Sequence, residues 1–274
     1  MSEKFAIKLG NVQKTLFLPL WGRAVETQKK EPLLVDRTAV EIIDGIDYDF
    51  STITSNISDV SQYGWIGRSL SVDKIVKGFI EAHPKSTIVN IGCGLDTTFE
   101  RIDNGSIYWF DLDLPDVIEL RRKFIHESER RKCISGSFLD YEWLNQLKGE
   151  DNILFIAAGV LYYFEEHQIK NFFSRIADLF PEGEIVFDAT PPLGIKMANK
   201  MVIKSSGMDE KSFLKWGLKR AEEIRQWDNR IKIMDEVSVF SGIKKSLNFK
   251  SRMGILISDM LKMQYMVHLK ITSS

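Results

Sequence analysis

The hydrophobic pattern of the chain changes character near residue 86. Before that point, apolar residues recur at helical spacing and no stretch alternates as a strand would. Three helices are predicted, over residues 15–28, 33–46 and 71–83. The first is interrupted by Pro19, the second stops near Gly45, and the third begins with Ser71 as its N-cap. Residues 1–85 are therefore predicted to form a helical cap.

From Ser86 onward, short apolar runs alternate with helical patterns. The runs read TIVNIG (87–92), SIYWFDLD (106–113), KCISGS (132–137), NILFIAAG (152–159) and EIVFDAT (184–190). Each of the first four is followed by a segment with helical spacing. This order is typical of βαβ units, and continuously apolar runs indicate parallel strands that are buried on both faces.

The C-terminal part predicts a largely helical block over residues 193–228, followed by two strands that bracket a helix. The strands are expected at 231–240 and 265–271, and the helix at 249–263. Such an ending is typical of Rossmann-like methyltransferases, in which the last strand lies antiparallel beside the fifth. The predicted fold is α/β, a Rossmann-like, seven-stranded, mostly parallel sheet with an antiparallel last strand and a helical cap. A single domain is expected, divided into 1–85 (cap), 86–190 (cofactor-binding core), 191–228 (cap insertion) and 229–274 (C-terminal strands and helix).

Composition narrows the class of protein. The 274 residues are 44% hydrophobic and 27% charged, as in an ordinary globular domain. A net charge of −1 provides no global field for nucleic acid or an anionic membrane. The N-terminus lacks the apolar core of a signal peptide, so a cytoplasmic location is expected. Two cysteines and four scattered histidines have no metal-ligand spacing, and no metal or membrane contact is predicted.

Two glycines, Gly92 and Gly94, follow the first predicted strand and allow a sharp turn that a ligand can approach closely. A dinucleotide fingerprint needs a third glycine where this chain has Thr97. Asp96 lies in the turn, where a carboxylate would repel a pyrophosphate but attract an ammonium group. The turn therefore favours S-adenosylmethionine over NAD as the cofactor.

The second predicted strand ends with Asp111 and Asp113 on one face. An acid about 20 residues beyond the glycine turn is where ribose hydroxyls are bound by a carboxylate. Asp113 is nearer the strand end and is the better candidate, and Asp111 is a second one. Either acid could instead only cap the following helix.

Together these residues resemble the leucine carboxyl methyltransferase family, which includes protein C-terminal carboxyl methyltransferases and polyketide-type O-methyltransferases. The resemblance is carried by IVNIGCGLDTTFERI, YWFDLDLPDVIELRRKFI, SFLDYEWL and IAAGVLYYF. It implies that Arg68 grips the carboxylate of the cofactor, that Gly92 forms the loop, and that Asp113 holds the ribose. It also implies that Ser137 and Phe138, with Asp140, border the adenine.

The resemblance also marks a departure. Ala158 replaces a family glutamate that often contacts the cofactor, which leaves Asp96 or a water as the partner of the amino group. Tyr163 matches a family tyrosine at the mouth of the site, and Tyr162 could be either a packing residue or a substrate contact. Arg23 lies where the family places a basic residue near the active site. It could bind an acceptor carboxylate or the cofactor, or it could be a surface arginine.

The sequence predicts an S-adenosylmethionine-dependent O-methyltransferase that acts on a carboxyl or hydroxyl group of a small molecule. A hydroxyl acceptor would require a base. His167 is expected at the surface, so a carboxyl acceptor is favoured. Met and Trp residues of 193–228 could form core or an adaptable pocket. The alternatives are a protein C-terminal carboxyl methyltransferase, a cofactor-binding protein with weak or lost catalysis, and an NAD-dependent oxidoreductase.

Overall fold

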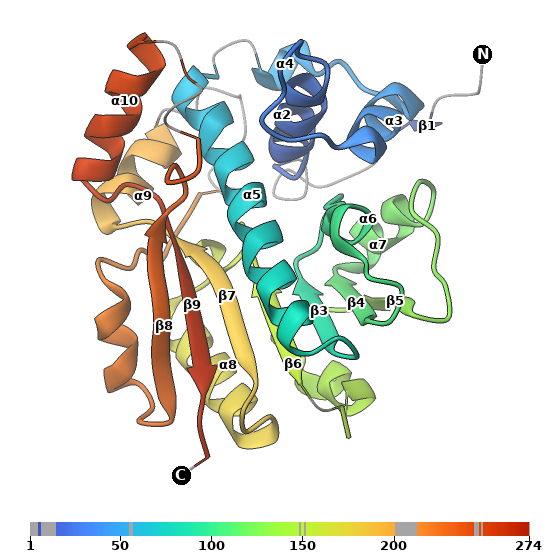
Figure 1. Cartoon of the computed structure of the whole chain (residues 1–274), viewed down its shortest axis with the longest axis vertical. Coiled ribbons are helices and arrows are strands. Elements are labelled where there is room, and N and C mark those ends of the chain that lie inside the picture. Colours follow the sequence, from blue (N-terminus) through green and yellow to red (C-terminus); the bar gives the residue numbers. More distant parts are fainter. Residues whose placement is uncertain are drawn as a thin grey trace.

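The computed structural model describes residues 5–6, 15–54, 57–147, 149–150, 152–200, 213–243, 247 and 249–273 (Figure 1). All seven predicted strands form one sheet, with the spatial order β5-β4-β3-β6-β7-β9-β8. Their bounds are β3 Thr87–Ile91, β4 Tyr108–Asp113, β5 Arg131–Ser135, β6 Ile153–Ala157, β7 Glu184–Ala189, β8 Ile231–Ser238 and β9 Tyr265–Ile271. Neighbours from β5 to β7 pair in parallel. The last strand, β9, runs antiparallel to β7 and β8, which confirms the predicted topology.

Helices cover both faces of this sheet (Figure 1). Their bounds are α2 Phe17–Thr27, α3 Arg37–Gly45, α4 Ser51–Thr54, α5 Asp59–Ala82, α6 Thr98–Ile102, α7 Pro115–Arg121, α8 Glu166–Leu179, α9 Pro192–Ala198 and α10 Phe249–Met260. Short 3-10 helices are η1 Tyr141–Leu147, η2 Leu161–Tyr163 and η5 Ala221–Gln226. On one face, Phe172 and Phe173 of α8 pack against the strands. On the other, Val72 and Val76 of α5 do so. The strands are thus buried from both sides, as their apolar runs indicate.

A third apolar cluster lies in the cap, and it includes the glycine turn. Phe17 and Leu20 of α2 pack with Ala39 and Ile42 of α3, and Leu95 from the turn lies among them. Because the same cluster contains cap and turn residues, the cap is fixed directly above the carboxyl ends of β3 and β4. The predicted boundary at residue 85 falls between α5 and β3, and the division of the chain into four parts stays a prediction.

Two helix predictions in the cap are wrong in their details. Helix α2 runs through Pro19, which lies in its first turn, where a missing N–H costs nothing because that donor has no helical partner. Helix α5 begins at Asp59 rather than after Ser71, and Ser58 is its N-cap, accepting from the backbone N–H of Ser61. The Ser71 hydroxyl instead donates to the carbonyl of Gly67 inside the helix.

The helical prediction for 193–228 is also only partly correct. Helix α9 ends at Ala198, residues 201–212 with Met201 and Met208 lie outside the described part, and 213–220 is irregular. There the backbone N–H groups of Lys215 and Trp216 donate to the Tyr162 carbonyl, which ties the segment to the loop after β6 instead of coiling it. Trp216 belongs to the sheet core, so this tryptophan is a packing residue.

Two further observations complete the fold. The strands β1 (Phe5–Ala6) and β2 (Ile46–Asp47) pair in parallel, although no strand was expected before residue 86. Two residues are too few to produce an alternating pattern. Among the helices that the structure describes, none has the length and apolar character needed to cross a membrane.

Candidate active site

The glycine turn follows β3, and both of its glycines have left-handed backbone angles. The φ angle is +60° at Gly92 and +49° at Gly94. A Cβ atom at Gly92 would lie 2.4 Å from Cγ2 of Val160, and one at Gly94 would lie 3.3 Å from Cβ of Leu16. The position that a side chain at Gly92 would occupy is thus filled by the protein's own Val160, and Gly92, Gly94 and Val160 all line the cavity.

Asp113 joins the turn to the neighbouring strand. Its Oδ2 accepts from the backbone N–H of Gly94 at 2.7 Å, and its Oδ1 accepts from that of Leu114 at 2.7 Å. Burial raises the pKa of this carboxyl to about 6, despite the two N–H groups that stabilise its charged form. Asp113 lines the cavity, where its remaining lone pairs can accept further hydrogen bonds.

Asp96 lines the same cavity, but its pKa is shifted in the opposite direction from that of Asp113. Burial by itself would raise the pKa of Asp96, but the charges of Arg101 and Arg23 and the N–H of Thr98 lower it to about 2. The carboxylate accepts from that N–H at 3.0 Å and from Nδ2 of Asn90 at 3.2 Å. Asp96 is therefore an anion at neutral pH.

The structure does not bring Asp111 to the cavity, contrary to the expectation that it binds the cofactor. It is completely buried. Its Oδ2 accepts from Nη2 of Arg121 and Nε of Arg131, both at 2.9 Å. Arg121 in turn donates from Nη1 to the carbonyl of Gly94 at 2.9 Å. All of these contacts lie within the protein, so Asp111 supports the turn from below.

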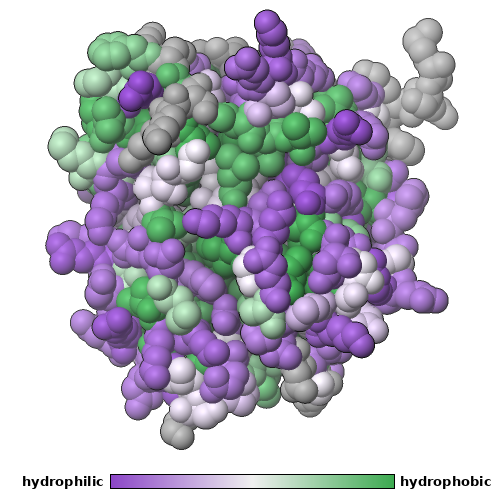
Figure 2. Space-filling model, viewed as in Figure 1, coloured by the Kyte–Doolittle hydropathy of each residue, from purple (hydrophilic) through white to green (hydrophobic). Residues whose placement is uncertain are grey.

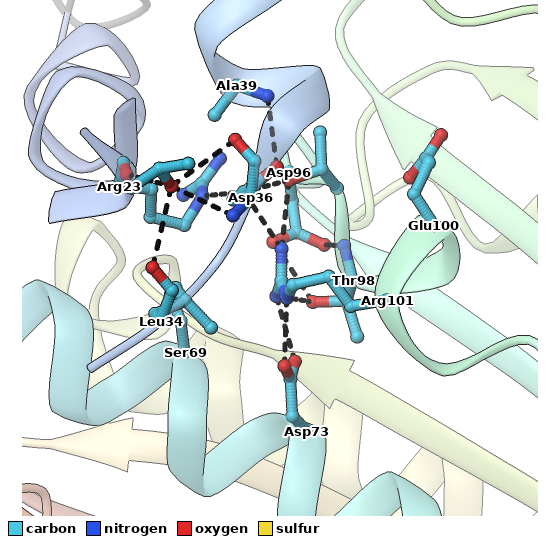
Figure 3. A network of polar contacts seen from close by, with 12 residues as sticks. Arg23, Leu34, Asp36, Ala39, Ser69, Asp73, Asp96, Thr98, Glu100 and Arg101 are labelled. Carbon is cyan, nitrogen blue, oxygen red and sulfur yellow. Dashed lines mark hydrogen bonds and ion pairs between the residues drawn. The ribbon is translucent and has the colours of Figure 1, made fainter. Parts of the chain in front are cut away.

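Arg23 lies in the cavity wall, but its contacts fix the cap (Figure 3). Nε donates to Oδ2 of Asp36 at 2.8 Å, and Nη2 donates to the carbonyl of Leu95 at 2.9 Å. Arg101 reaches the same Oδ2 at 3.0 Å and forms a two-pronged ion pair with Asp73 of α5. This buried network ties α2, α5 and α6 to the loop before α3, directly beside Asp96.

Arg68 of α5 lines the same cavity. Its Nη1 donates to Oδ2 of Asp188 and to the hydroxyl of Tyr162, both at 3.0 Å. Asp188 is the penultimate residue of β7, and its Oδ1 accepts from the N–H of Gly159 at 2.6 Å. Gly159 and Asp188 were missed from the sequence. A charged residue near the end of an otherwise apolar strand was the available signal.

The other predicted site residues also border the cavity. They are Ser137, Phe138, Ala158 and Tyr163. The Tyr163 hydroxyl donates to Oγ1 of Thr15 at 3.1 Å, and burial raises its pKa. Asp140, which was expected to border the adenine, is exposed and does not line the cavity. His167 is exposed, as expected. No group of three or more metal-ligating side chains occurs among the residues that the structure describes.

The cavity has a volume of about 760 Å³ and extends from the glycine turn to helices α9 and α10. Its lining includes a set of large apolar side chains: Val60, Trp65, Met197, Phe240, Ile257 and Leu261. Ile257, in α10, is 52% exposed, and Leu261, directly after α10, is 45% exposed. The apolar wall therefore continues to the surface, and Figure 2 shows hydrophobic side chains gathered over α10 at the upper left.

Comparison with known proteins agrees with this architecture. Residues 17–177 match the family profile described as leucine carboxyl methyltransferase. The tetracenomycin polyketide synthesis O-methyltransferase TcmP of Streptomyces glaucescens is 31% identical over 203 residues, 73% of this chain and 74% of that protein. Among solved structures, a DUF574 family protein of Streptomyces avermitilis has a TM-score of 0.61 at 9% identity, covering 94% and 97% of the two chains. The N-methyltransferase NodS of Bradyrhizobium japonicum, in complex with S-adenosyl-L-homocysteine, has a TM-score of 0.51 at 12% identity, covering 96% and 100%.

The sheet order, the glycine turn and these matches together define the class of protein: a Rossmann-like methyltransferase that uses S-adenosylmethionine. More narrowly, the chain belongs to the leucine carboxyl methyltransferase family, whose profile covers more than half of its length. The family resemblance seen in the sequence is thereby confirmed.

Proposed function

We propose that the protein methylates an oxygen of an apolar small molecule, and that a carboxyl oxygen is the favoured acceptor. The observation that carries this proposal is that Asp113 and Arg68 line the same continuous cavity as the apolar side chains of α9 and α10. One space can thus hold a polar cofactor and an apolar acceptor side by side, as methyl transfer requires.

The polar side chains of the cavity fit the chemistry of the cofactor. Asp113 is a hydrogen-bond acceptor suited to ribose hydroxyls, and Asp96 is a fixed anion suited to an ammonium group. Arg68 offers a guanidinium fork for a carboxylate. Ser137 and Phe138 would border the adenine. When bound, the cofactor supplies a methyl group that is already activated by the sulfonium sulfur.

The residues of the chain position the acceptor and exclude water. The described cavity lining contains no histidine, and burial raises the pKa of both Tyr162 and Tyr163, so both phenols keep their protons at neutral pH. Asp96, with a pKa of about 2, is a weak base, and Asp113, whose pKa is about 6, is assigned to the ribose hydroxyls. A carboxyl acceptor arrives deprotonated and needs no base, whereas an alcohol would. The lining therefore favours a carboxylate.

The two predicted catalytic residues, Tyr163 and Arg23, have different roles in this proposal. Tyr163 borders the cavity and stays a prediction as an acceptor contact, with its hydroxyl held by Thr15. For Arg23, the ion pair with Asp36 and the bond to Leu95 support a role in holding the cap and in lowering the pKa of Asp96.

The apolar acceptor is supported by the similarity to TcmP, whose name assigns it to tetracenomycin polyketide synthesis. The proposal is tested by titration with S-adenosylhomocysteine and NAD, followed by transfer of a radiolabelled methyl group to matched acceptors. We expect binding of S-adenosylhomocysteine and faster labelling of 2-naphthoic acid than of 2-naphthol or succinate. A peptide with a free C-terminal leucine tests the protein-carboxyl alternative. Binding of NAD alone, or labelling of succinate only, would refute the proposal.

The role of α10 has its own matched pair of variants. Ile257→Arg places a charge in the apolar wall and is expected to raise KM for the acceptor while leaving KM for S-adenosylmethionine unchanged. Met260→Arg is the control, because Met260 is 78% exposed and does not line the cavity. Equal effects of the two substitutions would show that the acceptor does not contact this wall.

A second candidate function is cofactor binding without effective transfer. It is favoured by Ala158, which borders the cavity where the family has a glutamate. Tight S-adenosylhomocysteine binding combined with no labelling of any acceptor, including the peptide, would support this second function instead.

A further inference from the structure

Asp188 is a completely buried carboxylate that the proposed chemistry does not use. It lies near the carboxyl end of β7, opposite Met266 of β9, and is not part of the cavity wall. Both of its oxygens are engaged, one by Nη1 of Arg68 and the other by the N–H of Gly159. A buried charge is costly unless it is paired and hydrogen-bonded, so these two contacts are what keeps it in place.

The contacts of Arg68 occupy only one corner of its guanidinium. Nη1 has two hydrogens, and it makes two hydrogen bonds, to Asp188 and to the Tyr162 hydroxyl. Within the described part of the chain, Nε and Nη2 make no hydrogen bond, while Arg68 lines the cavity. The edge formed by Nε and Nη2 is one that can bind a carboxylate through two parallel bonds.

The same aspartate also fixes the loop beneath this guanidinium. Gly159 has a φ angle of +87°, and a Cβ there would lie only 2.9 Å from Nη1 of Arg68. By accepting from the Gly159 N–H, Asp188 holds the loop against the face of the arginine. Ala158, the neighbouring residue in the cavity wall, is therefore positioned by the same contact.

We propose that Asp188 is a positioning residue for the amino-acid tail of the cofactor. It saturates Nη1 together with Tyr162 and so leaves the Nε–Nη2 edge of Arg68 for the tail carboxylate. This inference rests on the proposed function. In Asp188→Asn, one oxygen becomes an NH₂ group that faces a donor, so either Arg68 or Gly159 loses its acceptor.

The test compares S-adenosylhomocysteine with 5′-methylthioadenosine, which has the same adenosine and sulfur but no amino-acid tail. By calorimetry, Asp188→Asn is expected to raise Kd for S-adenosylhomocysteine by roughly tenfold or more, with Kd for methylthioadenosine changed by less than about twofold. Glu184→Gln is the control. It makes the same change on the same strand, at a residue that pairs with His268 and does not line the cavity.

A purely structural role would weaken both ligands equally, and that result would overturn the inference, as would an unchanged or tighter S-adenosylhomocysteine complex. In an Arg68→Ala background, Asp188→Asn should cause no further loss. If Asp188→Asn does not fold, Tyr162→Phe releases the other Nη1 hydrogen and should weaken only the ligand with the tail; no selective loss would overturn the inference. Failure of the proposed function looks different: the wild-type protein would then bind neither ligand.

Discussion

Gly92→Ala separates two reasons why a glycine can be required in the turn after β3. Alanine at φ +60° costs about 1–2 kcal/mol because its Cβ crowds the backbone. The new Cβ would also lie 2.4 Å from Cγ2 of Val160, and overpacking of this kind costs about 1–3 kcal/mol. We therefore expect Gly92→Ala to lower the free energy of unfolding by about 2–5 kcal/mol.

A second glycine isolates the backbone contribution. Gly105 has φ +81°, and a Cβ there would have no neighbour within 4 Å, so Gly105→Ala should cost only about 1–2 kcal/mol. Val160→Ala removes two methyl groups, which is about 1.6 kcal/mol at about 0.8 kcal/mol each. In the double variant, Gly92→Ala with Val160→Ala, the contacts with the two methyl groups at 2.4 and 3.1 Å are removed and only the 3.3 Å contact with Cβ at position 160 remains. The combined loss should therefore be about 1–3 kcal/mol smaller than the sum of the single losses.

The assay is urea unfolding of the ligand-free protein followed by circular dichroism. Equal losses for Gly92→Ala and Gly105→Ala, or strictly additive losses in the double variant, would refute the conclusion that Val160 excludes a side chain at position 92. The double variant should also bind S-adenosylhomocysteine nearly as well as the Val160→Ala protein. If the double variant binds no ligand, the absence of a side chain at position 92 is needed for the cofactor and not for packing against Val160.

Three further predictions concern charge. Burial raises the pKa of Asp113 to about 6 in the folded chain, so the contribution of Asp113 to stability falls as the pH rises through 6. Calorimetry should show that ligand affinity decreases as the pH drops below 6, because the Asp113 carboxyl that accepts hydrogen bonds from the ligand is then protonated. Asp36→Asn removes the carboxylate that pairs with the buried Arg23, while Arg101 keeps its ion pair with Asp73, and it should cost about 3–5 kcal/mol in urea unfolding. The exposed Asp44→Asn of α3 should cost about 0.5 kcal/mol or less. Ala158→Glu should tighten S-adenosylmethionine binding and Ala158→Gln should not; equal affinities of the two variants would contradict a charge effect.

The sheet could be predicted almost completely because its strands are buried on both faces and leave uninterrupted apolar runs. The cap could not be predicted as well. Ser71 has the composition of an N-cap, but the preceding turns of α5 are also helical, and burial of Ile66 and Arg68 at its inner face extends the helix back to Asp59. Segment 213–220 has a helical pattern, yet its backbone donors bond to Tyr162 and Thr190, so tertiary contacts override the local preference.

The site shows a similar division. Spacing along the chain indicated Asp113, because the glycine turn and the acid lie on adjacent parallel strands and meet at one edge. The same spacing could not distinguish Asp111, since its role depends on Arg121 and Arg131, which reach it from other elements. Asp188 lies 120 residues beyond Arg68, and their pairing is a product of the sheet order alone.

The two cavity carboxylates near the turn show what the cap contributes to the site. Asp96 and Asp113 are both half-buried, and burial by itself would raise both pKa values. Only Asp96 lies beside Arg101 and Arg23, which the cap network holds in place, and only its pKa is lowered. A permanent anion suits a cationic ammonium group, whereas a carboxyl that relies on backbone N–H groups suits neutral hydroxyls. The cap therefore acts on the site by charge in two ways: it supplies Arg23 directly, and its Asp36 and Asp73 hold Arg101 of α6 in place.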